Sequence, residues 1–408
     1  MPARVSIDSS TADTLRVLVP DLPVVDDYID ALRQIDARRW YTNGGVLCAQ
    51  FEAALATLVA GAAGPAQHCV TTSSGTAALE IALSCLDLPP RSRVLVPSYT
   101  FPATANAVLR AGHVPVLSDI CPRQWTLTPA LACAALEHER IDAVMPVAVF
   151  GARLPVAAWD AFSATTGVPV IIDAAAALGS MGGGARVFVA YSLHATKPLG
   201  IGEGGVIASA SADFATRARR MINHGFEGRV VTVAGTNARL SEYAAAIGLA
   251  QLARGPRVLE RRRALWNRYR AFLADVPGVA LQEGVDDVPP AVLTLRTSIA
   301  ADAVAASLAT HSIETRRWYA PPLHGHPAYA NVPHAARAGA FDVAEDLARH
   351  AIGVPFHAHL TPDDVGRVVR ALAETLAVRE RDATAAGTDE RSAHAAAASP
   401  HRVVIRPA

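Results

Sequence analysis

Lysine is almost absent from this chain of 408 residues. Among its 37 lysine and arginine residues Lys197 is the only lysine, so arginine supplies nearly all of the positive charge. Arginine stays protonated and its nitrogens are poor nucleophiles, so it cannot replace a lysine that forms a Schiff base. The single lysine is therefore a candidate for a chemical role. The alternative is one surface lysine that survived by chance, and the surroundings of Lys197 decide between the two.

An excess of charge of either sign is also absent, because 37 acidic residues balance the 37 basic ones. A nucleic-acid-binding protein usually has a basic excess, so the balance argues against that class. No apolar run is long enough to cross a bilayer, and residues 1–20 lack the apolar segment of a signal peptide. We therefore predict a cytoplasmic protein that binds neither nucleic acid nor membrane.

Cysteine is scarce, and its pattern excludes the common metal and redox motifs. No two of the five cysteines have Cys-x-x-Cys spacing, and none has a histidine at metal-ligand spacing. We interpret them as buried thiols in a reducing compartment and predict no metal site. The residues are Cys48, Cys69, Cys85, Cys121 and Cys133.

The middle of the chain alternates short apolar runs with longer amphipathic ones, and a hydrophobic fraction of 51% provides a sizeable core. This alternation predicts an α/β fold with a mainly parallel sheet, which binds ligands at the carboxyl ends of its strands. Strands are expected at His68–Thr72, Arg93–Val96, Val114–Ser118, Ala143–Val149, Val168–Ile172, Val187–Ser192 and Gly205–Ala208. Helices are expected at Thr76–Leu86, Ala103–Ala111, Pro129–Glu137 and Val156–Thr165.

Flanking segments complete the predicted organisation. Upstream we expect helices at Asp26–Arg38 and Ala49–Val59, and downstream Ser241–Leu273 is one long helix or two, with a possible break at Gly255–Pro256. A smaller α/β domain follows, with strands at Ala291–Arg296 and Ile313–Arg316 and helices at Ala301–Thr310, Phe341–His350 and Pro362–Ala377. The predicted parts are an N-terminal tail (1–20), a large domain (21–250), a small domain (251–378) and a disordered tail (379–408).

The surroundings of Lys197 favour a functional role. The residue lies between a predicted strand that ends at Ser192 and the glycine-rich loop Gly200-Ile-Gly-Glu-Gly-Gly205, where a parallel sheet opens its ligand crevice. Glycines in such a loop permit close backbone approach and unusual dihedral angles. A lysine in a loop is usually a solvated charge, but this combination makes that interpretation less favourable.

Three other segments end strands of the same predicted domain. Asp173 follows a buried strand; it can keep the pyridine nitrogen of pyridoxal phosphate (PLP) protonated, or it can cap a helix. The run Thr71-Thr-Ser-Ser-Gly75-Thr76 leads into a helix whose N-terminus can bind phosphate, with ordinary capping as the alternative. Phe101 can stack on a flat cofactor ring or belong to the core.

The four features together are more specific than any one of them, and with them the chain resembles the sugar aminotransferases of the DegT/DnrJ/StrS type. These are PLP enzymes of fold type I. The resemblance runs from about Trp40 to Pro362. Its most specific pieces are Ser74-Gly-Thr-Ala-Ala-Leu-Glu80, Ser192-Leu-His-Ala-Thr-Lys197, Gly202-Glu-Gly-Gly205, Asn223-His-Gly-Phe226, Gly235-Thr-Asn-Ala-Arg-Leu-Ser-Glu242 and Tyr319-Ala-Pro-Pro-Leu-His324.

The resemblance implies a fold and a cofactor site. The fold is a large domain with a mainly parallel mixed sheet flanked by helices, plus a smaller C-terminal α/β domain. The cofactor is PLP: Lys197 would hold it as a Schiff base and move protons, Asp173 would pair with its ring nitrogen, and Phe101 would stack on its ring. Its phosphate would be held by Gly75, Thr76 and Ser192.

The resemblance also implies a homodimer with shared active sites. Asn237 would reach the cofactor phosphate of the neighbouring subunit, and Arg239 would meet the carboxylate of the amino donor there. Tyr319 and His324 would lie in the segment that approaches the substrate. One departure stands out: the family has Gln or His three residues after the aspartate, near the cofactor's phenolic oxygen, but here that residue is Ala176.

The implied activity is transfer of an amino group from L-glutamate to a ketone of a nucleotide-linked deoxysugar, with dTDP as the expected nucleotide and antibiotic-sugar biosynthesis as the expected setting. The form of the segments around Asn223 and Asn237 resembles enzymes that act at C4 of a 4-keto-6-deoxyhexose. A 3-keto sugar, a 4-keto pentose and a cyclitol ketone are the alternatives. A PLP-dependent lyase and a sugar sensor without turnover are rivals; the first lacks a suitably placed cysteine, and Lys197 argues against the second.

Overall fold

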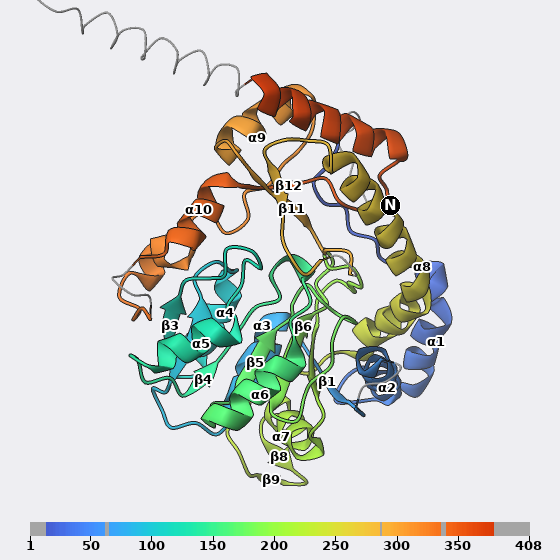
Figure 1. The fold of residues 1–408 in the computed structure, drawn as a ribbon. Coiled ribbons are helices and arrows are strands. Elements are labelled where there is room, and N and C mark those ends of the chain that lie inside the picture. The colour runs from blue at the N-terminus through green and yellow to red at the C-terminus, as the bar shows by residue number, and fades with distance from the viewer. Residues whose placement is uncertain (1–13, 62–64, 286–287, 336–339, 379–408) are drawn as a thin grey trace, which may run out of the picture.

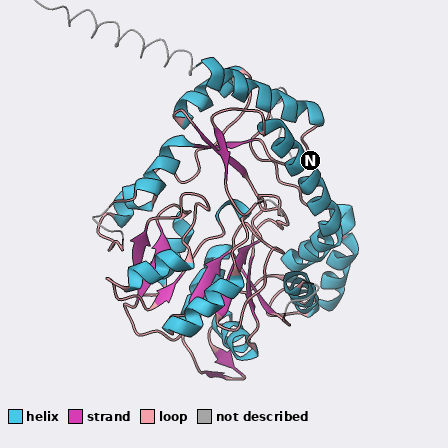
Figure 2. Cartoon of the chain, in the orientation of Figure 1, coloured by secondary structure: helices cyan, strands magenta, loops and turns pink. Residues whose placement is uncertain are grey.

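A computed structural model of the chain describes residues 14–61, 65–285, 288–335 and 340–378. The predicted tail 379–408, like residues 1–13, lies outside the described residues. The predicted α/β fold is confirmed. A large unit is built on a seven-stranded sheet, and a smaller unit carries a three-stranded sheet (Figures 1 and 2).

The large sheet is mixed, with one antiparallel strand. β7 runs antiparallel to both of its neighbours, and the remaining pairs are parallel. The strands are almost wholly buried, as expected for a sheet covered on both faces. The order across the sheet is β1 (His68–Thr72), β7 (Gly205–Ser209), β6 (Val187–Ser192), β5 (Val170–Asp173), β4 (Ala143–Val144), β2 (Arg93–Pro97) and β3 (Val114–Ser118).

Helices cover both faces of this sheet. On one face the apolar side chains of α3 (Gly75–Ser84), α4 (Pro102–Arg110) and α7 (Ala212–Ile222) share one core. On the other face a second core is filled by α1 (Ile29–Arg38), α2 (Val46–Ala60), α5 (Pro129–Leu136) and α6 (Val156–Thr166). Six strands that run in the same direction, all except β7, therefore present their carboxyl ends at one edge of the sheet, between two helical layers.

α8 (Glu242–Leu273) is one continuous helix that joins the two units (Figure 1). Pro256 lies inside it, so the predicted break at that point does not occur, although the ring removes one hydrogen-bond donor. Ala245 near its start belongs to the core of the large unit, and Trp266 and Tyr269 near its end belong to the core of the small unit. The predicted domain boundary after residue 250 thus falls within this helix.

The small unit is an antiparallel sheet with helices packed on it. Its strands are β10 (Val279–Leu281), β11 (Leu293–Thr297) and β12 (Ala351–Val354), with β11 in the centre. Its helices are α9 (Ala301–Thr310), α10 (Asp342–His350) and residues 362–378. The end of the predicted N-terminal tail lies against this unit, because Leu15 and Ile313 form an isolated backbone bridge.

Two predicted strands differ from the structure. β4 is only two residues long, because the chain turns after Pro146 into η2, a short 3-10 turn at Val149–Gly151. The predicted strand Ile313–Arg316 is wrong: its ends make only isolated bridges, one of them from Arg316 to β12. The prediction did not include α7, β10, β12 or the hairpin of β8 (Phe226–Glu227) and β9 (Val230–Val231).

Candidate active site

Asp173 is the last residue of β5 and only 4% exposed. The hydroxyl of Thr104 on α4 donates to its Oδ2 at 2.8 Å, and the backbone N–H of Ala175 donates to its Oδ1 at 3.1 Å. Burial raises the pKa of the Asp173 carboxyl, while these two hydrogen bonds and the charge of Lys197 lower it. No helix lies between β5 and β6, so this carboxylate is not a helix cap.

Lys197 lies in the loop after β6, in a turn that fixes its backbone. Its N–H donates to the carbonyl of His194 at 2.9 Å, and the N–H of Gly200 donates to the carbonyl of Lys197 at 3.0 Å. A Cβ on Gly200 would lie 2.4 Å from that His194 oxygen, so the turn requires glycine. Burial lowers the pKa of the Lys197 ammonium, opposed by Asp173. A lowered pKa leaves more neutral amine, the nucleophilic form.

The N-terminus of α3 lies directly against the end of β6. A Cβ on Gly75 would be 2.8 Å from the Cβ of Ser192, so only glycine allows this approach. Ser74 is the N-cap, and its hydroxyl accepts the N–H of Ala77 at 3.1 Å. The N–H groups of Gly75 and Thr76 have no acceptor within the described residues. Two free donors at the positive end of a helix form a cradle for an anion such as phosphate.

Phe101 is the N-cap residue of α4, and it is 62% exposed rather than part of the core. Its carbonyl accepts the N–H of Thr104, the residue whose hydroxyl binds Asp173. The open ring therefore lies one helical turn from the Asp173 contact, where it is free to stack on a flat ligand. Sequence reasoning assigned no role to Thr104, because a threonine one turn into a helix gives no distinctive signal.

The C-terminal segment brings Tyr319 to the same edge of the sheet. Its ring stacks on Phe150, with centroids 5.3 Å apart and planes 4° apart, and meets Tyr99 edge-on at 5.2 Å. Phe150 follows β4 and Tyr99 follows β2, so Tyr319 lies over the carboxyl ends of these strands. Burial raises the pKa of the Tyr319 hydroxyl, and the charge of Asp173 raises it further.

The side chain of His324 contacts other residues of the same chain through both ring nitrogens and one ring face. Its Nδ1 lies 2.6 Å from the hydroxyl of Ser98, and its Nε2 lies 2.7 Å from Oε1 of Glu345 on α10. The imidazole also stacks on Phe341 at 4.1 Å. Both ring nitrogens therefore have protein partners, and the residue links α10 to the loop after β2.

Asn237, which is exposed, and Arg239, which is half-buried, lie in a polar cluster. The guanidinium of Arg239 donates to Oδ1 of Asn237 at 2.8 and 3.0 Å and to Oδ1 of Asn223 at 2.8 Å; it also donates to Asn43. All of these acceptors are neutral amides. Neither Asn237 nor Arg239 makes a hydrogen bond or ion pair with Lys197 or Asp173 of the same chain.

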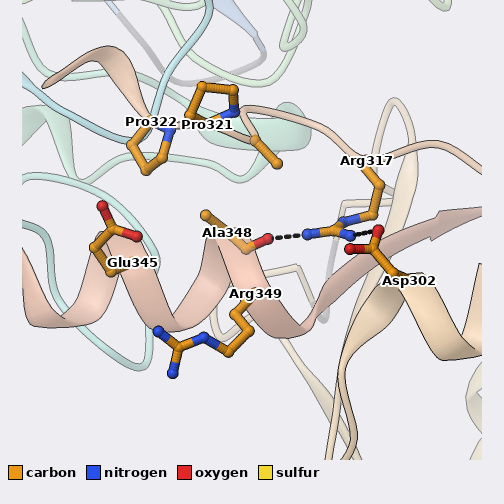
Figure 3. Close-up of a pocket in the computed structure, with 8 residues that line it drawn as sticks. Asp302, Arg317, Pro321, Pro322, Glu345, Ala348 and Arg349 are labelled. Carbon is orange, nitrogen blue, oxygen red and sulfur yellow. Dashed lines mark hydrogen bonds and ion pairs between the residues drawn. The ribbon is translucent and has the colours of Figure 1, made fainter. Parts of the chain in front are cut away.

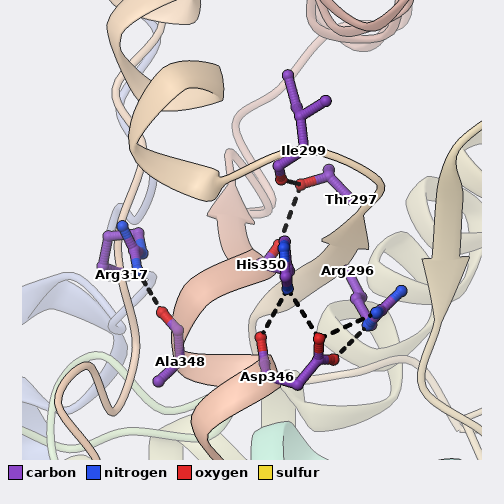
Figure 4. Close-up of polar contacts among 7 residues, drawn as sticks. All are labelled: Arg296, Thr297, Ile299, Arg317, Asp346, Ala348 and His350. Carbon is purple, nitrogen blue, oxygen red and sulfur yellow. Dashed lines mark hydrogen bonds and ion pairs between the residues drawn. The ribbon is translucent and has the colours of Figure 1, made fainter. Parts of the chain in front are cut away.

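Two hollows lie on either side of α10, and neither is lined by Lys197. One, of about 400 Å³, is close to the segment that carries Tyr319 (Figure 3). It is lined by Asp302, Arg317, Ala320, Pro321, Pro322, Glu345, Ala348 and Arg349. The other, of about 480 Å³, includes Arg296, whose guanidinium pairs with Asp346 at 2.7 Å and fixes α10 to β11 (Figure 4). These contacts hold the small unit together.

A lysine with a lowered pKa, a buried carboxylate and a pair of free helix N–H groups follow strands of one sheet, as expected for a PLP-dependent enzyme of fold type I. Residues 24–373 match the DegT/DnrJ/EryC1/StrS aminotransferase family, and the chain belongs to this family. The predicted resemblance, fold and cofactor are thereby confirmed: the protein is a PLP-dependent sugar aminotransferase, and its cofactor is PLP.

Individual relatives are similar in sequence to this chain over nearly its whole length. Protein Mb3436c of Mycobacterium bovis is 34% identical over 380 residues, which is 90% of this chain and 91% of the relative. A dTDP-3-amino-3,4,6-trideoxy-alpha-D-glucose transaminase of Streptomyces venezuelae is 31% identical over 90% of this chain and 98% of its own. The solved structure of DesI in the presence of its TDP-sugar product superposes with a TM-score of 0.79 at 30% identity, covering 92% of this chain and 96% of DesI.

Proposed function

We propose that this enzyme moves an amino group from L-glutamate to C4 of a dTDP-linked 4-keto-6-deoxyhexose. The observation that carries the proposal is the pair of Lys197 and Asp173, a half-buried amine and a buried carboxylate that follow neighbouring strands β6 and β5 and influence each other's pKa. The names of two similar proteins, a transaminase of a dTDP-linked amino sugar and DesI with a TDP-sugar product, support the substrate class.

The chain's residues fit PLP in a defined orientation. Lys197 holds the cofactor through its amine, Asp173 keeps the ring nitrogen protonated, and Phe101 covers one face of the ring. The N–H groups of Gly75 and Thr76 and the hydroxyl of Ser192 bind its phosphate. The carboxylate of Asp173 cannot rotate freely, because Thr104 and Ala175 each hold one of its oxygens.

Bound in this way, PLP supplies an electron sink for the bond broken at the α-carbon of the amino donor. Once the amino group of the donor has replaced Lys197 on the cofactor, the freed neutral amine of Lys197 would take the proton from that carbon and later deliver a proton to the acceptor sugar. Its lowered pKa suits this role, since an amine that titrates closer to neutral pH can both accept and donate.

The proposed active unit is a cytoplasmic homodimer in which Asn237 and Arg239 serve the partner's site. Arg239 makes no ion pair with a carboxylate among the described residues, so its charge is available for the carboxylate of the amino donor. The hairpin beside it exposes apolar side chains: Val230 is 63% exposed and Val231 55%. Apolar side chains at a hairpin tip favour burial against a second protein surface.

No described helix is long and apolar enough to cross a membrane.

We propose that His324 affects substrate binding without contacting the substrate. Its two hydrogen bonds to Ser98 and Glu345 hold the segment that carries Tyr319, so it acts on substrate binding through position. Tyr319 lies at the sheet edge itself and is the better candidate for direct contact.

The position of the keto group is tested with a panel of nucleotide-linked sugars. The enzyme, PLP and L-glutamate are incubated with 4-keto and 3-keto deoxyhexoses, a 4-keto pentose and a cyclitol ketone, and release of 2-oxoglutarate is followed. The proposal predicts turnover with the 4-keto-6-deoxyhexose and an amino group at C4 in the product by NMR. Turnover of the 3-keto sugar alone would contradict the proposal of a 4-keto substrate. It would favour the 3-keto alternative, in line with the name of the Streptomyces relative, which refers to a 3-amino sugar.

A further inference from the structure

The two edges of the PLP ring face different parts of this chain. In PLP the phosphate arm and the phenolic oxygen lie on opposite sides of the line from the ring nitrogen to the carbon that lysine binds. In the proposed orientation the phosphate edge faces α3 and the end of β6, where Gly75 meets Ser192. The phenolic oxygen therefore faces the other way along the sheet, from β5 towards β4 and β2.

The residues on that side offer few hydrogen-bond donors. Ala176 and Phe150 have none in their side chains. A Cβ on Gly151 would lie 2.9 Å from the carbonyl oxygen of Ala176, so the turn after β4 packs directly against this alanine. Phe150 precedes Gly151, and its ring stacks on Tyr319. Ala176 and Tyr319 therefore both pack against the turn after β4, Ala176 through Gly151 and Tyr319 through Phe150.

The hydroxyl of Tyr319 is free to act as a donor. Within the described residues it has no hydrogen-bond partner, and it is not among the enclosed polar atoms. The hydroxyl of Tyr99 is likewise unpartnered but fully enclosed, so it does not reach a ligand. Backbone φ angles of +57° at Phe150 and +56° at Tyr319 are unfavourable for these residue types, which indicates that surrounding contacts impose this arrangement.

The charged groups around Tyr319 keep it protonated. Burial raises the pKa of its hydroxyl, and the carboxylate of Asp173 on β5 acts in the same direction. Asp173 also acts on Lys197, whose pKa it raises, and Arg317, two residues before Tyr319, lowers the pKa of Tyr99. A neutral phenol keeps its proton and can therefore donate a hydrogen bond to a negatively charged oxygen at the phenolic edge of the cofactor.

We propose that the hydroxyl of Tyr319 donates a hydrogen bond to the phenolic oxygen of PLP, in place of a side chain at position 176. The inference rests on the proposed placement of the cofactor between Lys197 and Asp173. A donor stabilises negative charge on that oxygen, so the oxygen holds the proton that it shares with the nitrogen of Lys197 less strongly. That proton therefore leaves at a lower pH than it would without Tyr319.

The test is a pH titration of the visible absorption of the PLP-loaded protein without substrate. Tyr319→Phe keeps the stacked ring and removes only the hydroxyl, and we expect the titration midpoint to rise by about one pH unit or more. Tyr99→Phe is the matched control, and its midpoint should equal that of the unaltered protein. Adding Ala176→Gln to Tyr319→Phe restores a donor on this edge and should move the midpoint back down.

The outcomes separate this inference from the proposed function. A Tyr319→Phe midpoint equal to that of the unaltered protein, or an equal shift in Tyr99→Phe, would overturn the role of Tyr319 and leave the site of cofactor binding intact. An unaltered protein that binds PLP without any absorption band dependent on Lys197 would overturn both proposals. A raised midpoint in Tyr319→Phe with reversal by Ala176→Gln supports the inference.

Discussion

The hydroxyl of Thr104 on α4 donates a 2.8 Å hydrogen bond to Oδ2 of Asp173 at the end of β5. Phe101 lies one turn earlier on the same helix. One short helix therefore orients both the carboxylate and the aromatic ring that are proposed to hold the cofactor. The backbone N–H of Ala175 binds the other oxygen of Asp173, so rotation of the carboxylate breaks at least one hydrogen bond.

Thr104→Val is expected to weaken PLP binding. The substitution keeps the shape of the side chain but leaves Oδ2 of Asp173 without its donor, and a hydrogen bond to a charged group is worth about 1.5–3 kcal/mol. We expect the dissociation constant for PLP to rise roughly 10- to 100-fold, measured by fluorescence titration of the apoprotein. Thr100→Val is the control, because Thr100 contacts Thr104 at 3.0 Å but does not contact Asp173. Equal losses in both variants would contradict the assignment.

Asp173→Asn is expected to stabilise the apoprotein while weakening cofactor binding. Because burial raises the pKa of Asp173, the folded chain holds this proton more tightly than the unfolded chain does. Stability of the apoprotein therefore falls as the pH rises from the ordinary carboxyl pKa through the raised one. The amide removes the buried charge, and we expect a gain of roughly 1 kcal/mol or more at neutral pH in urea unfolding. A variant less stable than the unaltered apoprotein would contradict this account.

Gly75→Ala is expected to damage the phosphate cradle. The added Cβ would lie 2.8 Å from the Cβ of Ser192, so the start of α3 must move away from β6. Longer hydrogen bonds to the phosphate should weaken PLP binding by about tenfold or more.

Gly255→Ala provides the matched control for that substitution. Gly255 lies in α8, and a Cβ there would meet only Leu199 at 3.8 Å. Alanine is favoured over glycine in a helix by about 0.5–1 kcal/mol, so this variant should melt at a slightly higher temperature and bind PLP normally. If both variants bind PLP equally well, the close approach of Gly75 to Ser192 does not serve the cofactor.

Mixing two inactive variants tests whether the active sites are shared between subunits. Lys197→Ala removes the proposed anchor, and Arg239→Ala removes the proposed donor-carboxylate contact. If Arg239 acts on the partner's site, a dimer of one subunit of each kind has one intact site and one that carries both changes. Activity should then appear after the two proteins are refolded together but not when either is alone. Mixed dimers that remain inactive would place Arg239 in the site of its own chain.

Much of this site could be predicted because its residues follow strands. Asp173, Lys197 and the start of α3 each come directly after an apolar run, so the sheet alone brings them to one edge. Thr104 could not be found in this way, because its role depends on how α4 packs against β5. The contact between Tyr319 and Phe150 joins residues far apart in the chain and depends on the small unit.

The small unit was harder to predict for a physical reason. β12 begins directly after α10 without any turn residues, so its four residues resemble the end of a helix. Ile313–Arg316 carries an apolar residue beside polar ones and resembles an edge strand, but it meets β12 only at Arg316. A Cβ on Gly353 of β12 would lie 2.4 Å from Nε1 of Trp318, so an aromatic side chain occupies the space beside this strand.

The most direct test of the central claim is the visible absorption spectrum of the PLP-loaded protein before and after addition of L-glutamate. The account predicts a band that requires Lys197, is absent from Lys197→Ala and Lys197→Arg, and bleaches when L-glutamate is added, with release of 2-oxoglutarate. The arginine variant keeps the positive charge, so its failure would show that the amine itself is needed. A band that persists unchanged in either Lys197 variant, or one that L-glutamate does not bleach, would contradict the account.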